Sequence, residues 1–268
     1  MKFTAAICQI ALALLLLHGA PANAQGDRRP QVADAKPGDL RVLVTAAIRE
    51  PLDAVLAQAR RVVGRPLVVE YGSARGNLKE KILAGQDFEV AILLPDVNEE
   101  LAKQGKILPE SYEIARVNVA IGLRGEAPGL DVGTPAALKH AMLNARAVRY
   151  APTGAAILTV RKVLATLGIA ASIKDASRER GPVELAPGEY ELNLYPLSEI
   201  IPNKALKNLG AVMPELQVPV IITAVIGKHA NDEAAARALV RFLQGPAIDK
   251  ALEADGMMKG TASGEAPR

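Results

Sequence analysis

One short stretch, residues 69–79, combines residue types that could bind an anion. It reads Val-Glu-Tyr-Gly-Ser-Ala-Arg-Gly-Asn-Leu-Lys, which is typical of a strand end, a loop of small residues and the first turn of a helix. Unpaired N–H groups and the positive end of a helix dipole converge at such a junction, which suits an anionic group. Arg75 could offer a planar fork to a carboxylate or phosphate, or it could be an ordinary solvated arginine. Ser73 and Gly76 could contact the same anion, or they could only shape the turn, with Asn77 capping the helix that follows.

Three other groups of residues are candidates for the same binding site. The first follows a buried strand and can offer backbone N–H groups, the second begins a later helix with small side chains, and the third lies where a later strand ends. In that order they are Ala46, Ala47 and Ile48; Thr153, Gly154, Ala155 and Ala156; and Tyr195, Pro196 and Ser198. Tyr195 could equally be structural, and Arg178 and Arg180 are interpreted as surface residues.

The N-terminal residues have the pattern of a secretory signal peptide. Lys2 precedes an apolar run over residues 7–17, and Ala22-Asn23-Ala24 is typical of a cleavage site. The apolar run is too short for the roughly 20 residues that span a bilayer. We therefore expect residues 1–24 to be removed after Ala24, to leave a flexible leader over residues 25–39, and to place the protein in the periplasm.

Composition excludes several classes of function. The one cysteine, Cys8, lies inside the signal peptide, so the exported chain has no disulfide, thiolate nucleophile or cysteine metal site. The net charge is +3 without a dense basic run, which argues against nucleic acid as a partner. His140 and His229 have no metal-ligand spacing, and motifs of serine hydrolases and P-loops are missing. The sequence therefore predicts binding without catalysis, metal or cofactor.

Apolar strands alternate with amphipathic helices along the chain. Strands are expected at residues 40–45, 66–71 and 89–94, each followed by a helix, which is the pattern of an α/β domain with a parallel sheet. The pattern restarts after about residue 116. Two long β-rich segments, 115–123 and 216–226, bracket a middle lobe and predict two crossings between lobes. The expected division is 40–116 plus 222–259 for lobe I, 117–221 for lobe II, and 260–268 for a tail.

An ordered set of motifs resembles one family. The segments are Arg41-Val-Leu-Val-Thr-Ala-Ala47, Leu78-x-x-x-Ile82-x-Ala84-Gly85, Glu89-Val-Ala-Ile-Leu-Leu-Pro-Asp96, Glu199-Ile-Ile-Pro202, Val218-Pro219-Val220 and Ala238-Leu-Val-Arg-Phe-Leu-Gln-Gly-Pro246. Together, over residues 40–259, they are similar to the molybdate-binding-protein-like (ModA-like) substrate-binding proteins of ABC transporters. This resemblance implies a type II periplasmic-binding-protein fold: two α/β lobes, two crossover strands and a ligand cleft between the lobes.

The resemblance also implies a binding site, from which this sequence departs. The family binds molybdate with one Ser after strand one, another after strand two, backbone donors of a lobe II helix and a Tyr before the return crossing. Here Thr45-Ala46-Ala47-Ile48 has no Ser, Arg75 stands where a hydroxyl is expected, and the Tyr position falls near Pro196. Each missing donor to a buried charge costs roughly 1–3 kcal/mol.

The sequence therefore predicts a monomeric solute-binding protein that captures a small anion for an ABC permease in the inner membrane. An organic carboxylate or another non-molybdate anion is the expected ligand. Molybdate or tungstate remains an alternative, and so do a periplasmic ligand sensor and an enzyme on the same fold.

Overall fold

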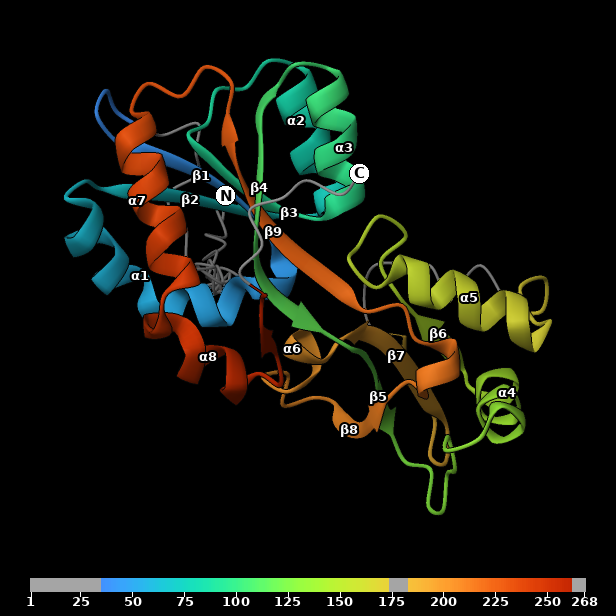
Figure 1. Cartoon of the computed structure of the whole chain (residues 1–268). Helices are drawn as coiled ribbons and strands as arrows, with labels where there is room; N and C mark the ends of the chain where they lie inside the picture. Colours follow the sequence, from blue (N-terminus) through green and yellow to red (C-terminus); the bar gives the residue numbers. More distant parts are fainter. Residues whose placement is uncertain (1–34, 174–182, 262–268) are drawn as a thin grey trace, which may run out of the picture.

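The computed structural model describes residues 35–173 and 183–261. The predicted signal peptide, most of the predicted leader, Arg178, Arg180 and most of the predicted C-terminal tail lie outside these residues. The described part forms two α/β lobes, each built around its own sheet (Figure 1). The predicted type II fold is confirmed. No described helix is long and apolar enough to cross a membrane.

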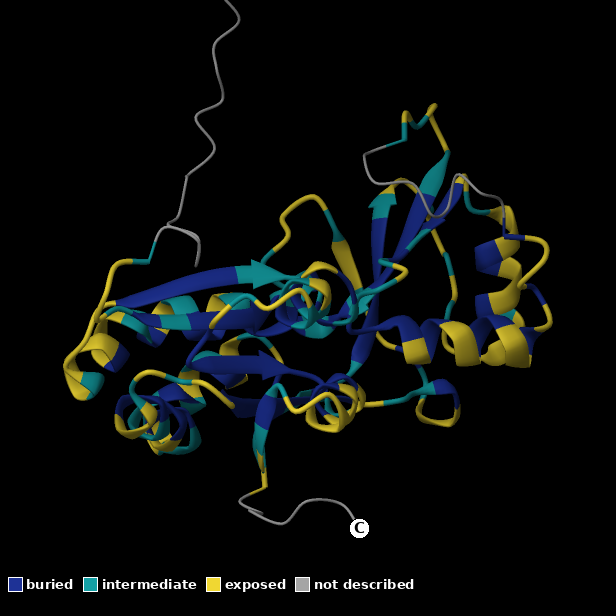
Figure 2. Ribbon diagram, turned by 90° about the horizontal axis from the view of Figure 1, so that it is seen from above, coloured by how far each residue is buried: buried dark blue, intermediate teal, exposed yellow. Residues whose placement is uncertain are grey.

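The first lobe contains a six-stranded mixed sheet in the order β10-β4-β9-β3-β1-β2. Strands β1 and β3 are buried on both faces except at Arg41, as expected for central parallel strands. Figure 2 shows that the dark blue, buried segments include strands of the sheets, while the exposed residues lie mainly on helices and loops. Helices α1 and α7 pack together on one side of the sheet, while α2 and α3 lie on the other (Figure 1). The elements of this lobe are β1 (Leu40–Thr45), α1 (Arg49–Val63), β2 (Leu67–Gly72), α2 (Lys79–Leu83), β3 (Val90–Leu93), α3 (Pro95–Lys103), β4 (Ile107–Val117), β9 (Val220–Gly227), α7 (Glu233–Gln244), α8 (Asp249–Ala254) and β10 (Met258–Lys259).

Several helix ends follow the sequence signals. Gly64 adopts a left-handed conformation (φ 71°) directly after α1, where a side chain would be strained. The Asp232 side chain caps α7 by accepting a hydrogen bond from the Ala235 N–H (2.9 Å). These stops and starts fix the lengths of the helices and therefore the places where the chain returns to the sheet.

The second lobe contains a four-stranded sheet in the order β6-β7-β5-β8. Strand β6 runs parallel to β7, while β5 is antiparallel to both β7 and β8. Helices α4 and α5 pack against each other in this lobe, and the short α6 lies near the junction with the first lobe (Figure 1). The elements are β5 (Val119–Gly125), α4 (Pro135–Asn144), β6 (Ala147–Arg149), α5 (Ile157–Leu167), β7 (Tyr190–Pro196), α6 (Leu197–Ile200) and β8 (Lys207–Ala211).

The two crossings differ in detail from the long strands that the sequence predicts. Asn118 interrupts the first one, so that β4 belongs to one sheet and β5 to the other. The second begins with a 3-10 turn (Pro214–Leu216), and β9 starts only at Val220. Gln217 ties the crossings together: its side-chain Oε1 accepts from the Val119 N–H and its Nε2 donates to the Val119 carbonyl, both at 3.0 Å.

Candidate functional site

The first two loops of lobe I meet at one edge of its sheet. Strands β1 and β2 are parallel and end side by side, with Thr45 paired to Gly72. The chain then continues as a 3-10 turn (Ala46–Ile48) after β1 and as Ser73 after β2. Ala47 and Ile48 are buried, and Ala46 is half-buried. This edge also begins α1, so it presents a helix N-terminus, as the sequence predicts.

The loop after β2 folds differently from the predicted helix cap. Residues Ala74–Leu78 form an irregular helical turn, and α2 follows without a side-chain cap. The predicted capping role of Asn77 is wrong, because its Oδ1 accepts a hydrogen bond from the Ser73 N–H (2.8 Å) and so closes the loop backwards. Gly72 is required for this closure, since a Cβ there would lie 2.6 Å from the Asn77 amide nitrogen.

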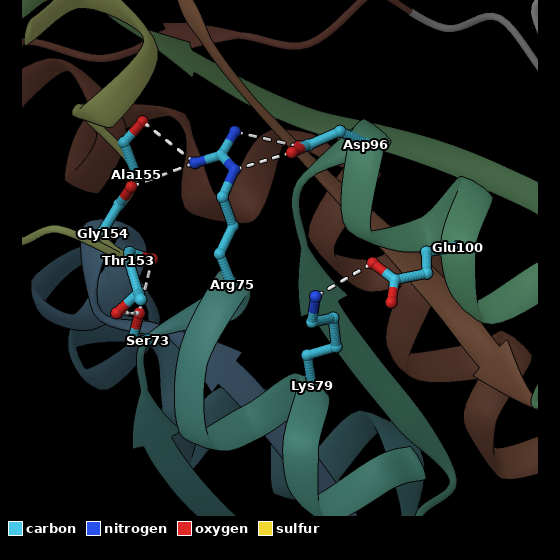
Figure 3. A network of polar contacts seen from close by, with 8 residues as sticks. All are labelled: Ser73, Arg75, Lys79, Asp96, Glu100, Thr153, Gly154 and Ala155. Atoms are coloured by element: carbon cyan, nitrogen blue, oxygen red, sulfur yellow. Dashed lines mark hydrogen bonds and ion pairs between the residues drawn. The ribbon is translucent and has the colours of Figure 1, made fainter. Parts of the chain in front are cut away.

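Ser73 joins the two lobes (Figure 3). Its Oγ donates to the carbonyl oxygen of Thr153 at 2.6 Å and lies 2.9 Å from the Thr153 hydroxyl. Gly76 makes this approach possible, because a Cβ at Gly76 would lie only 2.8 Å from the Thr153 Oγ1. Candidate residues from opposite lobes, far apart in sequence, are therefore in direct contact.

Arg75 makes the second contact between the lobes. Its Nη1 donates to the carbonyl oxygen of Gly154 (3.0 Å), while its Nε and Nη2 hold the Asp96 carboxylate at 2.6 and 2.9 Å (Figure 3). The Arg75 side chain is only 16% exposed. All three guanidinium nitrogens thus have protein partners, which lie in both lobes. Whether Arg75 also contacts a ligand stays a prediction.

The lobe II candidates near these contacts form a tight turn before α5. Ala155 and Ala156 are buried, and Ala156 immediately precedes the helix. A Cβ on Gly154 would lie 2.6 Å from the Ala151 Cβ, so the turn needs glycine there. Small residues in this turn let the first lobe approach the start of α5 closely.

The last candidates lie around the end of β7. The buried Ser198 Oγ donates to the Ala47 carbonyl (2.6 Å), which is another contact between the lobes. Pro196 is buried and pairs with Val119 within the sheet. Tyr195 is half-buried and lines a cavity of about 320 Å³. The structure thus groups Ala46–Ile48 with Ser198, and Ser73, Arg75 and Gly76 with Thr153–Ala155, whereas Tyr195 faces a separate cavity.

Sequence reasoning missed two charged residues at the junction of the lobes. Arg49, the first residue of α1, stacks on the ring of Tyr71 with its Cζ 4.1 Å from the ring centroid. Glu199 of α6 is half-buried, and this burial raises the pKa of its carboxyl to about 7, although the nearby positive charge of Arg49 opposes the rise. The sequence contains one signal for Arg49: a cation at the start of a helix is unfavourable with the helix dipole, so its presence there calls for an explanation.

Comparisons with known proteins place this geometry in a family. Residues 40–258 match the family described as bacterial extracellular solute-binding protein. The chain is 28% identical over 236 residues to the molybdate-binding protein ModA of Azotobacter vinelandii, which covers 83% of this chain and 90% of that protein. It is 21% identical over 227 residues to an aconitate isomerase of a Pseudomonas species, which covers 81% of this chain and 87% of that protein.

A solved structure agrees with the sequence comparison. The periplasmic molybdate-binding protein of Azotobacter vinelandii superposes with a TM-score of 0.63 at 22% identity, and the match covers 82% of this chain and 98% of that one. The resemblance to molybdate-binding-protein-like (ModA-like) substrate-binding proteins is confirmed. The chain, with its two lobes and two crossings, belongs to the family of bacterial extracellular solute-binding proteins.

Proposed function

We propose that this protein captures a small anion in the cleft between its lobes and delivers it to an ABC permease in the inner membrane. It would act in the periplasm as a monomer, after loss of residues 1–24, and without a cofactor or a catalytic step. The two lobes would correspond to residues 40–116 plus 222–259 and to residues 117–221, with the hinge at the two crossings.

One observation carries this proposal: candidate residues of both lobes meet in the structure. Ser73 and Arg75 of lobe I contact Thr153 and Gly154 of lobe II directly. A ligand that bridges loops from both lobes stabilises the closed arrangement, and a permease can read that arrangement. The protein would then act on the permease through its change of conformation, and it would catalyse no reaction.

The hydrogen bonds of the cleft favour an organic anion over molybdate. The hydroxyls of Ser73 and Ser198 each donate to a backbone carbonyl, so a tetrahedral oxyanion would have to compete for these donors. One relative is named for an isomerase of aconitate, an organic acid, which supports a carboxylate ligand on this fold. Molybdate or tungstate is the second candidate, because the chain is 28% identical to a molybdate-binding protein.

A thermal-shift screen separates these candidates. The exported chain is heated with molybdate, tungstate or sulfate, and in parallel with acetate, malate, citrate or aconitate. A ligand at 100 times its Kd should stabilise the folded chain by about 2.7 kcal/mol. We expect an organic acid to raise the Tm. A rise with molybdate or tungstate alone would favour the second candidate, and no rise with any anion would contradict anion binding.

A further inference from the structure

Arg49 forms no ion pair and no side-chain hydrogen bond to a carboxylate among the residues that the structure describes, although its charge acts on the nearby Glu199. Other described arginines, such as Arg41, Arg75 and Arg237, hold carboxylates at 3.2 Å or less. Arg49 instead lies over the face of Tyr71. The Tyr71 hydroxyl donates to Asp53 Oδ1 (2.7 Å), which fixes the ring as a platform. A cation–π contact of this kind holds the guanidinium in place and leaves its N–H groups able to donate to a carboxylate.

The position of Arg49 points to a role between the lobes. Arg49 begins α1, where a positive charge is opposed by the helix dipole. It directly follows the turn that receives the hydrogen bond of Ser198 from lobe II. Its charge also acts on Glu199, the neighbour of Ser198. A cation that holds no carboxylate, at a helix N-terminus and next to a turn that contacts the other lobe, is well placed to bind an anionic guest.

A cavity lies beyond Glu199 in lobe II. Its volume of about 320 Å³ falls within the range of roughly 300–1,000 Å³ typical of small-molecule sites. A tetrahedral oxyanion would fill only a small part of it, since a single water takes about 30 Å³. The lining residues are Arg124, Arg149, Glu191, Asn193, Tyr195, Glu199, Asn203, Ala205 and Leu206.

The polar wall of this cavity is built around one buried carboxylate. Glu191 is 2% exposed. Arg124 Nη2 holds it at 2.8 Å, Arg149 Nε lies 3.6 Å away, and the Asn193 amide donates to it at 3.0 Å. The cavity wall therefore carries polar groups that their mutual contacts hold in fixed positions, next to Leu206. Such a mixed wall suits hydroxyl and carbon groups of an organic molecule.

We propose that Arg49 binds a carboxylate of the ligand and that the cavity beside Glu199 and Tyr195 holds the rest of it, so that the ligand is a small organic acid with polar substituents. This inference rests on the proposed function and names the ligand class and the anchor for it. It adds a cation of lobe I and a cavity of lobe II to the contacts between the lobes described above.

Isothermal titration of the exported chain tests the proposal with malate, citrate and aconitate as organic acids and sulfate and molybdate as oxyanions. Arg49→Gln should raise the Kd for the bound organic acid roughly 10- to 100-fold, because it removes a charge-assisted bidentate contact. Arg49→Lys should recover only part of the affinity. Arg61→Gln, an exposed arginine in the last turn of the same helix, should bind like the wild type.

A second variant tests the cavity. Ala205 lines it and is exposed, so Ala205→Phe narrows the cavity without changing the core, and it should weaken citrate more than acetate. Organic-acid binding that is unchanged in Arg49→Gln would overturn this inference and leave the proposed function standing. Binding of oxyanions alone would do the same. Failure of every anion to bind would overturn both.

Discussion

Ser73 Oγ in the first lobe lies 2.6 Å from the carbonyl oxygen of Thr153 in the second, and the two residues are 80 positions apart in sequence. The contact forms at a place where the neighbouring Gly76 has no side chain. The structure therefore shows the lobes packed against each other through atoms of the protein itself. Any ligand that stabilises this arrangement acts together with these contacts.

Gly76→Ala should weaken ligand binding by hindering closure. The added Cβ would lie 2.8 Å from Thr153 Oγ1 and 3.2 Å from Ser73 Oγ, so the closed arrangement loses stability relative to the open one. A loss of about 1–2 kcal/mol corresponds to a Kd roughly 5- to 30-fold higher. Titration measures the affinity, and small-angle scattering should show a larger radius of gyration.

The double variant Gly76→Ala/Thr153→Ala is the control for this effect. It removes the hydroxyl nearest to the added methyl group and should recover part of the affinity. Wild-type affinity and dimensions in the single variant would show that the Gly76–Thr153 approach has no role in closure.

Arg75→Met should increase the ligand dissociation rate. The side chain links Asp96 of α3 to the Gly154 carbonyl of lobe II, so its loss removes a charge-assisted contact from the closed arrangement, worth roughly 1.5–3 kcal/mol. Asp96→Asn should have a smaller effect of the same sign, because Asp96 positions the guanidinium. Stopped-flow measurements of ligand release would detect both changes.

Lys79→Met provides the matched control for Arg75. Lys79 pairs with Glu100 at 2.9 Å and so also connects the β2–α2 segment to α3, but this ion pair lies within lobe I (Figure 3). We expect its release rate to equal that of the wild type. Equal effects of the two variants would mean that Arg75 acts on lobe I alone.

Arg41→Met should destabilise the fold by about 3–5 kcal/mol. Glu89 is 1% exposed, and burial alone would raise its pKa. Hydrogen bonds from the Arg41 side chain and N–H and from Asn231 outweigh burial and lower this pKa. The variant leaves a buried carboxylate without its cation. Urea unfolding at pH 7 measures the loss, while Arg61→Met should stay within about 0.5 kcal/mol of the wild type.

The Arg41–Glu89 pair also predicts how the stability of the fold depends on pH in acidic solution. Because the pKa of Glu89 is lower in the folded than in the unfolded chain, its contribution is present above the unfolded value and declines as the pH falls through the folded one. The double variant Arg41→Met/Glu89→Leu should lose this dependence. An unchanged pH dependence in that variant would assign it to other carboxylates.

Glu199→Gln should stabilise the protein in alkaline but not in acidic solution. The pKa of Glu199 is raised to about 7, chiefly by burial, from a usual value near 4.5. The folded chain therefore holds this proton more tightly than the unfolded chain, and stability falls as the pH rises between these values. The variant lacks this dependence and should gain on the order of 2–3 kcal/mol above pH 7.

Urea unfolding at pH 5 and pH 8 measures this difference. The exposed Glu215, also in the second lobe, gives the control Glu215→Gln, for which we expect no pH-dependent gain. Equal stabilities of wild type and Glu199→Gln at pH 8 would show that Glu199 ionises without a penalty in the folded chain.

The sequence predicts the local elements well where one pattern dominates. The apolar run before Thr45 and the glycine stop at Gly64 are visible in the residues themselves, and β1 has the expected bounds and is followed by a helix. The short strand β8 (Lys207–Ala211) is mostly exposed and has no apolar alternation. It exists because it pairs with β5, which is a tertiary cause that one sequence does not display.

The site is less predictable for the same reason. Ser73, Arg75 and Thr153 could be selected by residue type and by their place after strands. Their partners depend on how the lobes pack, and Asp96, which holds Arg75, is separated from it by 21 positions. Arg49 belongs to no motif, and apart from its place at the start of a helix, only the fold, through the contact with Tyr71, distinguishes it from a surface arginine. Such roles depend on which residues of the two lobes come within contact distance, and one sequence does not display this.

Gln217 has a consequence for the way the lobes move. Its side-chain amide hydrogen-bonds to both the N–H and the carbonyl of Val119, as a neighbouring strand would, and also donates to the Val212 carbonyl (3.0 Å). The two crossings are therefore hydrogen-bonded to each other where they enter lobe II. Because the two crossing segments are hydrogen-bonded to each other, one lobe cannot easily rotate about a single crossing while the other crossing stays fixed. The open protein should therefore sample a narrow, nearly one-dimensional path, and less configurational entropy is lost each time the lobes come together.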